Sequence, residues 1–355
     1  MKAIAFLGLL LAYGPAASAA ACVWPLSSCA EWVTLQGGPG RSMVYRTHAL
    51  EEKNEAITQA LIVIHGQGRD ADNYYRHGIA AAFLAGALER TLIVSPKFAS
   101  SHGNCHDTIG ANELNWHCSG PERWTSGGPA VGRTDLTSFH FVDELLRRLA
   151  RRELFPNLKA VVIAGHSAGG QYVTRYEMAN GMHDKLGVAV TYVVSNPSSY
   201  TYTDALRPTA SALPADVAAG APGYTPGTPA KPPEAFTAFH DAHGCTGYDQ
   251  WPYGMQKRVG YTARLDNDSL KRQLAARPVT YLLGELDILP LYGFDSSCSA
   301  MAQGPTRLAR GLAYHRYVNE KLGAAHKVVI VPACGHNARC MFGAEVALPV
   351  LFPKE

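Results

Sequence analysis

The 355-residue chain has few charged residues and no strong imbalance of charge. Asp, Glu, Lys and Arg make up 17% of it, below the roughly 25% of typical soluble domains. The 32 basic and 29 acidic side chains nearly cancel, and no basic run or aromatic-interleaved basic patch occurs. Nucleic-acid binders usually carry such patches, so we expect no nucleic-acid partner. The low charge suits an exported protein.

The chain also lacks an apolar run of the roughly 20 residues that a membrane-spanning helix needs. Its N-terminal apolar run, residues 3–12, follows Lys2 and precedes a group of small residues. This arrangement predicts a secretory signal peptide over residues 1–21, with cleavage after Ala19 or Ala21. Lipoprotein processing at the next cysteine is an alternative, although the leucine usual upstream is missing. We therefore predict a secreted or periplasmic protein without stable membrane insertion.

Eight cysteines follow the predicted signal peptide, and an even number in an exported chain predicts disulfides. Pairing of near neighbours would join Cys22 to Cys29, Cys105 to Cys118 and Cys334 to Cys340, and would leave Cys245 for Cys298. This is one of many connectivities that such a set allows.

The irregular segment 100–132 contains several His and Cys residues at short spacings, namely His102, Cys105, His106, His117 and Cys118. In a cytosolic protein these spacings would suggest a zinc site, because such ligands close a tetrahedral shell. Export makes a disulfide loop the better explanation. We therefore predict no metal here.

The most informative stretch is residues 159–172, K-A-V-V-I-A-G-H-S-A-G-G-Q-Y. Its apolar, β-branched part, residues 160–164, predicts a strand buried on both faces of a parallel sheet. The pattern G-x-S-x-G follows at once, with Ser167 at its centre. This pattern predicts a sharp strand-to-helix turn at which glycines prevent side-chain collisions and the serine hydroxyl stands clear. A helix is expected over residues 169–180.

With this pattern the chain resembles the α/β-hydrolases from about residue 40 to its C-terminus, apart from one poorly matched insertion. The resemblance implies fold class α/β, with a mostly parallel central sheet flanked by helices. It also implies one domain over residues 22–355, with a cap-like insertion between core strands at about 198–277. In that family the order along the chain is oxyanion loop, nucleophile, acid, histidine.

The residues match this order. His65-Gly66-Gln67-Gly68 has the H-G-x-G pattern, which implies that the backbone N–H groups of Gln67 and Ala168 form the oxyanion hole. The resemblance implies Asp287 as the acid, with Glu285 and Asp295 as alternatives. It implies His336, after the last core strand, as the base. No cofactor or metal is required by this chemistry.

Apolar runs and turn residues predict the remaining core elements. Strands are expected at 42–47, 60–64, 91–95, 186–194, 279–283 and 327–331, and helices at 77–89, 135–153 with Thr134 as N-cap, and 306–322. Residues 22–40 are expected to consist of turns.

The predicted insertion carries four aromatic residues, Tyr248, Trp251, Tyr253 and Tyr261. They would either bind an apolar or aryl substrate beneath a cap or anchor the insertion to the core, and both interpretations stay open.

Together these features predict a secreted serine hydrolase that cleaves small-molecule or polymeric carboxylic esters through Ser167, His336 and Asp287 and an acyl-enzyme. The triad does not distinguish esters from amides, so a serine peptidase or amidase is the main alternative. A non-catalytic binding protein of the same fold is a third. The sequence carries no indication of oligomeric state.

Overall fold

The structure, a computed structural model, describes residues 20–36, 38–209, 235–239 and 244–354. Residues 1–19 of the predicted signal peptide and residues 210–234 and 240–243 of the predicted insertion lie outside the described residues.

Eight strands of the described chain form one sheet, in the order β1-β2-β4-β3-β7-β8-β11-β12. Pairing is antiparallel between β1 and β2 and between β2 and β4, and parallel from β4 to β12. The strands are β1 (Ala30–Thr34), β2 (Arg41–Arg46), β3 (Gln59–Ile64), β4 (Thr91–Pro96), β7 (Ala160–His166), β8 (Ala189–Ser195), β11 (Val279–Gly284) and β12 (Lys327–Val331). The predicted mostly parallel sheet is confirmed.

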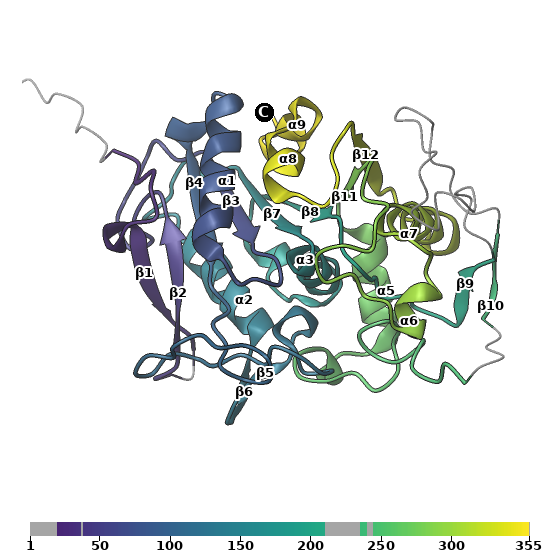
Figure 1. Ribbon diagram of the computed structural model, residues 1–355. Helices are drawn as coiled ribbons and strands as arrows, with labels where there is room; N and C mark the ends of the chain where they lie inside the picture. The colour runs from purple at the N-terminus through teal and green to yellow at the C-terminus, as the bar shows by residue number, and fades with distance from the viewer. Residues whose placement is uncertain (1–19, 37, 210–234, 240–243, 355) are drawn as a thin grey trace, which may run out of the picture.

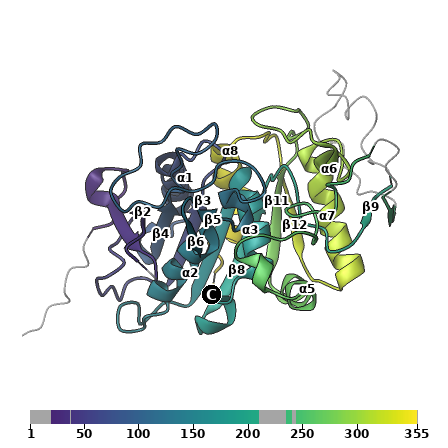
Figure 2. The ribbon, with the colours of Figure 1, turned by 90° about the horizontal axis from the view of Figure 1, so that it is seen from below.

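Helices cover both faces of the sheet (Figure 1). One face packs against α1 (Ala71–Leu84), α8 (Ala338–Gly343) and α9 (Leu348–Leu351). The other packs against α2 (Ser138–Leu149), α3 (Ala168–Ala179), α5 (Asn267–Ala276) and α7 (Arg307–Leu322), which are labelled in Figure 2. No helix of the described residues is both long and apolar enough to cross a membrane.

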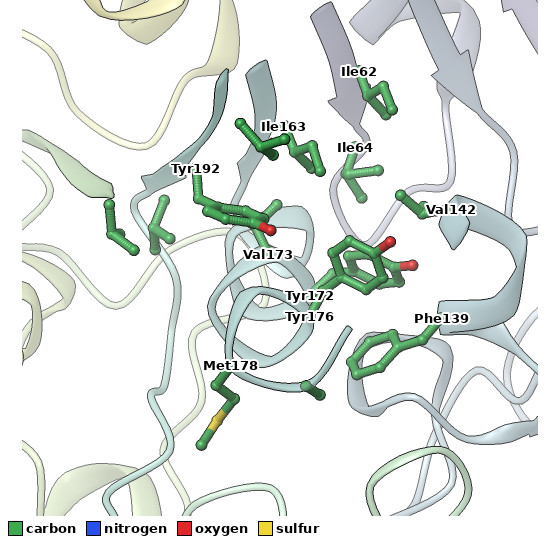
Figure 3. Close-up of a cluster of buried hydrophobic side chains, with 14 of the residues drawn as sticks. Ile62, Ile64, Phe139, Val142, Ile163, Tyr172, Val173, Tyr176, Met178 and Tyr192 are labelled. Atoms are coloured by element: carbon green, nitrogen blue, oxygen red, sulfur yellow. The ribbon is translucent and has the colours of Figure 1, made fainter. Parts of the chain in front are cut away.

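The core has two parts because side chains along each central strand alternate between the faces. In β3, Leu61 and Val63 face α1, whereas Ile62 and Ile64 face α2 and α3. Figure 3 shows the second part, where strand isoleucines meet the tyrosines of α3 and Phe139 of α2. This double burial explains why the strands have nearly continuous apolar sequences.

The helix predicted over 135–153 begins later than expected, and the prediction of Thr134 as its N-cap is wrong. Asp135 lies in β6 (Arg133–Thr137), where its carboxylate is 2.8 Å from the guanidinium of Arg133. Thr137 is the N-cap: its hydroxyl accepts a hydrogen bond from His140 N, and its own N–H donates to the imidazole of His140. This reciprocal capping fixes the helix start at Ser138.

Other boundaries also differ from expectation. The strand predicted over 186–194 is β8, which begins at Ala189, and the helix predicted over 135–153 ends at Leu149. The helix predicted over 77–89 is α1, which begins at Ala71 and ends before Gly86, a residue with φ of +60°. The turns expected before residue 40 include the edge strand β1. Its five residues are paired on one side only, with β2, so tertiary pairing rather than local pattern defines this strand.

Two short antiparallel pairs lie outside the sheet. They are β5 (Pro129–Ala130) with β6, and β9 (Leu206–Pro208) with β10 (Phe236–Ala238). The second pair belongs to the predicted insertion and lies at the end of the molecule away from β1, near α6 (Cys298–Met301) and α7 (Figures 1 and 2).

Candidate active site

Ser167 lies at the turn between β7 and α3, with φ of 60° and ψ of −119°. A positive φ is uncommon for a residue other than glycine and is retained mainly at functional sites. The flanking glycines are sterically required. A Cβ on Gly165 would lie 2.2 Å from the carbonyl oxygen of Gly169, and a Cβ on Gly169 would lie 2.2 Å from that of Ile64. The predicted reason for glycine at both positions is confirmed.

Three side chains from separate loops form a continuous hydrogen-bonded chain. Ser167 Oγ is 2.9 Å from His336 Nε2, and His336 Nδ1 is 2.7 Å from Asp287 Oδ2. The loops follow β7, β12 and β11, whose carboxyl ends meet at one edge of the parallel sheet. Because the carboxylate only accepts, Nδ1–H donates to Asp287, and Nε2 is left to accept the Ser167 proton.

The two alternative acids lie elsewhere. Glu285 Oε2 accepts a hydrogen bond from Ala333 N at 2.9 Å, and Asp295 Oδ2 accepts one from Tyr253 Oη at 2.7 Å. Asp287, which is 2% exposed, is the acid that the structure places against His336.

Arg307 is a buried contributor that the sequence analysis missed. Its Nη1 is 3.4 Å from Asp287 Oδ1, on the side away from His336, and its Nε donates to Ser198 Oγ at 2.7 Å. Its Nη2 donates to the carbonyl oxygens of Leu291 and Tyr292 at 2.8 and 3.1 Å. Burial lowers the pKa of Arg307, and the charge of Asp287 opposes that shift. Arg307 thus ties the acid to a later part of its own loop and to Ser198, which follows β8.

Asn196, at the end of β8, links the acid and histidine loops. Its Oδ1 accepts from Gly284 N at 2.8 Å and its Nδ2 donates to Gly335 O at 3.3 Å. It is fully buried and has a positive φ of 44°. No motif marks Asn196, and its position directly after a predicted strand is the single feature of the sequence that could have pointed to it.

The predicted oxyanion loop lies against the elbow. A Cβ on Gly66 would lie 3.8 Å from Ser167 Cβ, and Gln67 lines the same cleft as Ser167. Ala168 is the first residue of α3, so its N–H has no acceptor within the helix. Ala168 thus adjoins the serine in the chain and Gln67 lines the same cleft, as the predicted oxyanion hole requires.

His65 holds this loop in place through two hydrogen bonds. Its Nδ1 donates to Gly66 O at 2.9 Å, and its Nε2 accepts from Phe98 N at 3.0 Å. Burial lowers the pKa of His65 to about 4, so the ring is neutral at pH 7 and holds both bonds. Its edge packs on Trp124, which is buried rather than at the cleft rim.

Another buried histidine, His166, lies beside the triad histidine His336. The ring of His166 is 4.6 Å from that of His336, centre to centre, and its Nδ1 is 3.0 Å from Tyr74 Oη. Burial, with the nearby His336 and Arg307, holds the pKa of His166 well below its usual range. His166 is therefore an uncharged side chain that lines the site.

The cleft over Ser167 has a volume of about 560 Å³. Besides Gly66–Gly68, Ser167 and His336, its lining includes the ionisable side chains of Asp70, His77 and Arg339. Within the described residues, no part of 198–277 lines it.

The aromatic residues of the insertion contact the body of the protein. Trp251 Nε1 donates to Ser126 O at 2.9 Å, and Tyr261 Oη donates to the buried carboxylate of Asp143 at 2.8 Å. These contacts support the anchoring interpretation for the described part of the insertion.

All four predicted disulfides are present, joining Cys22 to Cys29, Cys105 to Cys118, Cys245 to Cys298 and Cys334 to Cys340. The bond between Cys105 and Cys118 occupies both sulfurs of the His- and Cys-rich segment. The zinc alternative would need those thiolates free.

Comparison with known proteins agrees with this geometry. The profile of the "Alpha/beta hydrolase family" matches residues 61–347, and the chain belongs to that family. No curated protein sequence matches significantly.

Among the solved structures that share the fold are two with TM-scores above 0.5. One is LpqC, a poly(3-hydroxybutyrate) depolymerase from Bordetella parapertussis, with TM-score 0.56, 23% identity and coverage of 88% of this chain and 84% of that one. The other is poly(aspartic acid) hydrolase-1 from Sphingomonas sp. KT-1, with TM-score 0.57, 22% identity and coverage of 88% and 95%. At this identity the likeness establishes the fold.

Proposed function

We propose that the protein is an exported serine hydrolase that cleaves carboxylic esters, with Ser167 as nucleophile, His336 as base and Asp287 as acid. The observation that carries the proposal is the hydrogen-bonded chain from Ser167 Oγ through His336 to Asp287, at 2.9 and 2.7 Å. It lies at the strand-to-helix turn beside an open cleft.

In this mechanism Ser167 Oγ attacks the acyl carbonyl while His336 Nε2 takes its proton. Asp287 holds the Nδ1–H tautomer and stabilises the imidazolium. The N–H groups of Gln67 and Ala168 bind the negative charge that develops on the carbonyl oxygen. His336 then protonates the departing alcohol, and a water molecule, deprotonated by His336, releases the acid from the acyl-enzyme.

An ester is favoured over an amide because an alkoxide or phenoxide leaves with less demand on protonation than an amine. The family is also rich in esterases. Export is supported by the N-terminal pattern and by four disulfides, which persist in oxidising compartments. We further propose that residues 22–355 form one domain and that 198–277 is its insertion.

The test is hydrolysis of a p-nitrophenyl ester series, from acetate to long acyl chains, by purified mature protein and by Ser167→Ala. The proposal expects turnover that the substitution lowers by several orders of magnitude. Undiminished turnover in the variant would refute the assignment of Ser167. Labelling of Ser167 by a fluorophosphonate without any ester turnover would favour a peptidase or amidase. Absence of both would favour a binding protein.

A further inference from the structure

A second hollow adjoins the cleft over Ser167. Its volume is about 410 Å³, and it shares Tyr292, His336 and Asn337 with that cleft. His336 therefore borders both spaces, and a substrate bound at Ser167 lies beside the second one.

The two spaces differ in chemistry. The first presents Asp70, His77 and Arg339. The second presents the apolar and aromatic side chains of Leu286, Leu289, Leu291 and Tyr292, and its other lining residues are Asp287, Gly335, His336 and Asn337. Its ionisable groups, Asp287 and His336, are already bonded to each other at 2.7 Å. The second hollow thus offers no free charge to a ligand and favours an apolar group.

The apolar side chains here are unusually accessible for their type. Leu289, Leu291 and Tyr292 are 41%, 48% and 74% exposed. They belong to a rim segment, residues 289–294, that borders both spaces. Exposed apolar side chains grouped beside the cleft over Ser167 indicate a binding surface.

The rim segment is held from beneath by two buried arginines. Arg307 Nη2 donates to the carbonyl oxygens of Leu291 and Tyr292. The guanidinium of Arg310 lies 4.3 Å from the ring centre of Phe294. Tyr292 keeps a positive φ of 53°, a conformation that costs energy for a side-chain-bearing residue. The segment is therefore a pre-organised surface, which lowers the entropic cost of binding.

The chemistry of the proposed triad decides which half of an ester lies here. His336 Nε2 must reach the leaving oxygen to protonate it. The departing alcohol is therefore on the His336 side of Ser167, whereas the carbonyl oxygen faces Gln67 and Ala168. The space that opens beyond His336, past Tyr292 and Asn337, is the second hollow.

We propose that the hollow lined by Leu286, Leu289, Leu291 and Tyr292 is the subsite for an apolar alcohol moiety of the ester substrate. This inference rests on the proposed function and adds to it the class of substrate: an ester whose alcohol part is apolar. Each methylene buried there is expected to raise kcat/KM by about two- to fourfold.

The test uses isomeric esters that place the same carbon atoms on opposite sides of the bond. Butyl acetate puts the alkyl chain on the alcohol, and methyl pentanoate puts it on the acid. Acid release is followed in a pH-stat for both, on the wild type, Leu291→Ser and Leu289→Trp. Leu84→Ser is the matched control, because Leu84 is 59% exposed and lines neither space.

The expected result is a fall of about fivefold or more in the ratio of kcat/KM for butyl acetate to that for methyl pentanoate in Leu291→Ser. Leu289→Trp, which fills the hollow, is expected to lower the same ratio. Leu84→Ser should leave it unchanged. A ratio that stays constant or rises in both rim variants would overturn the subsite.

Failure of the subsite is distinguishable from failure of the proposed function. If the wild type cleaves both isomers and Ser167→Ala cleaves neither, the esterase stands and the ratio alone decides the subsite. If the wild type cleaves neither isomer nor any p-nitrophenyl ester, the proposed function fails and the subsite falls with it.

Discussion

The carboxylate of Asp287 is bonded from two sides. His336 Nδ1 donates to one oxygen at 2.7 Å, and Arg307 lies 3.4 Å from the other. Asp287 and Arg307 are both buried, so neither is screened by water. Arg307 also holds the backbone of Leu291 and Tyr292. We infer that it positions Asp287 and the rim segment together.

Arg307→Lys tests this role. Lysine keeps the charge but loses the planar fork that reaches Asp287, Ser198 and two carbonyl oxygens. We expect kcat for p-nitrophenyl acetate to fall by about tenfold or more, because small displacements of catalytic groups are costly. Steady-state kinetics and the melting temperature are measured together.

Arg277→Lys is the matched control for that variant. Arg277 is also buried, but its guanidinium donates to the carbonyl oxygens of Glu177 and Asn180, and to neither Asp287 nor the rim segment. It should lose stability while retaining kcat. Equal losses of kcat in both variants would show that Arg307 acts only through general stability.

Two buried neutral histidines make stability depend on pH. Burial lowers the pKa of both His65 and His326 to about 4, from an ordinary value near 6.5. The unfolded chain therefore binds more protons between these values, and stability falls as pH drops from about 6.5 to about 4. Each histidine contributes at most roughly 3 kcal/mol to this loss.

Urea unfolding across this pH range measures the effect. The midpoint should decrease steadily towards pH 4, and His326→Asn should show a shallower decrease than the wild type. His106→Gln, at an exposed position, should retain the full slope. A midpoint that does not change between pH 6.5 and 4 would contradict the buried neutral state of these rings.

At the scale of elements, the loop that carries His336 is closed by the disulfide between Cys334 and Cys340. The bond joins the residues after β12 to α8, and Asn337 caps that helix through a hydrogen bond from Cys340 N at 3.0 Å. His336 lies inside this small ring. The disulfide therefore restricts the position of the imidazole directly.

A double variant, Cys334→Ser with Cys340→Ser, tests this restriction. Loss of a bridge of this span is expected to cost about 2 kcal/mol in stability, and freedom of the imidazole should lower kcat by about tenfold. The matched control is Cys22→Ser with Cys29→Ser. Its sequence separation is 7, against 6 for the first bridge, and neither of its cysteines lines the cleft.

The control should lose a similar amount of stability but no kcat. Denaturant midpoints and p-nitrophenyl acetate kinetics report the two quantities separately. If the variant Cys334→Ser with Cys340→Ser kept the kcat of the wild type, the bridge would have no role in positioning His336.

The elements show where sequence patterns are informative. Strands β3, β4 and β7 are buried on both faces, so their apolar runs predict them almost residue by residue. The elbow at Ser167 is predicted because its glycines meet local backbone atoms. In contrast, the start of α2 depends on hydrogen bonds between Thr137 and His140, which make Thr137 rather than Thr134 the N-cap. Strand β1 depends on pairing with β2.

The candidate site was predictable where a residue follows its own strand. Ser167, Asp287 and His336 do so, and the structure brings their side chains together. Arg307 and Asn196 carry no motif, and their partners lie in other loops. The position of the insertion was not predictable either, because Trp251 is fixed by Ser126, far away in the chain.

At the scale of the whole molecule, the four disulfides leave no free cysteine in the described chain. The sulfur of Cys22 is bonded to Cys29, whereas lipoprotein processing would modify that sulfur. The bridge thus argues against lipoprotein processing at Cys22, and we propose export with cleavage after Ala19 or Ala21.

Mass spectrometry of the exported protein tests the predicted cleavage site and the pairing of the cysteines. We expect an N-terminus at Ala20 or Cys22, no alkylation of the denatured unreduced chain, and alkylation of all eight cysteines of the sequence after reduction. An acylated Cys22, or an uncleaved N-terminus on the exported protein, would contradict the proposed processing.

The central claim is that Ser167 forms an acyl-enzyme with help from His336 and Asp287. The most direct measurement is a rapid-quench reaction with p-nitrophenyl acetate, followed by peptide mass spectrometry. We expect a burst of p-nitrophenol equal to the enzyme concentration and an acetyl group on Ser167, both absent in Ser167→Ala. Turnover that persists in Ser167→Ala, with no acetyl group on Ser167 of the wild type, would contradict it.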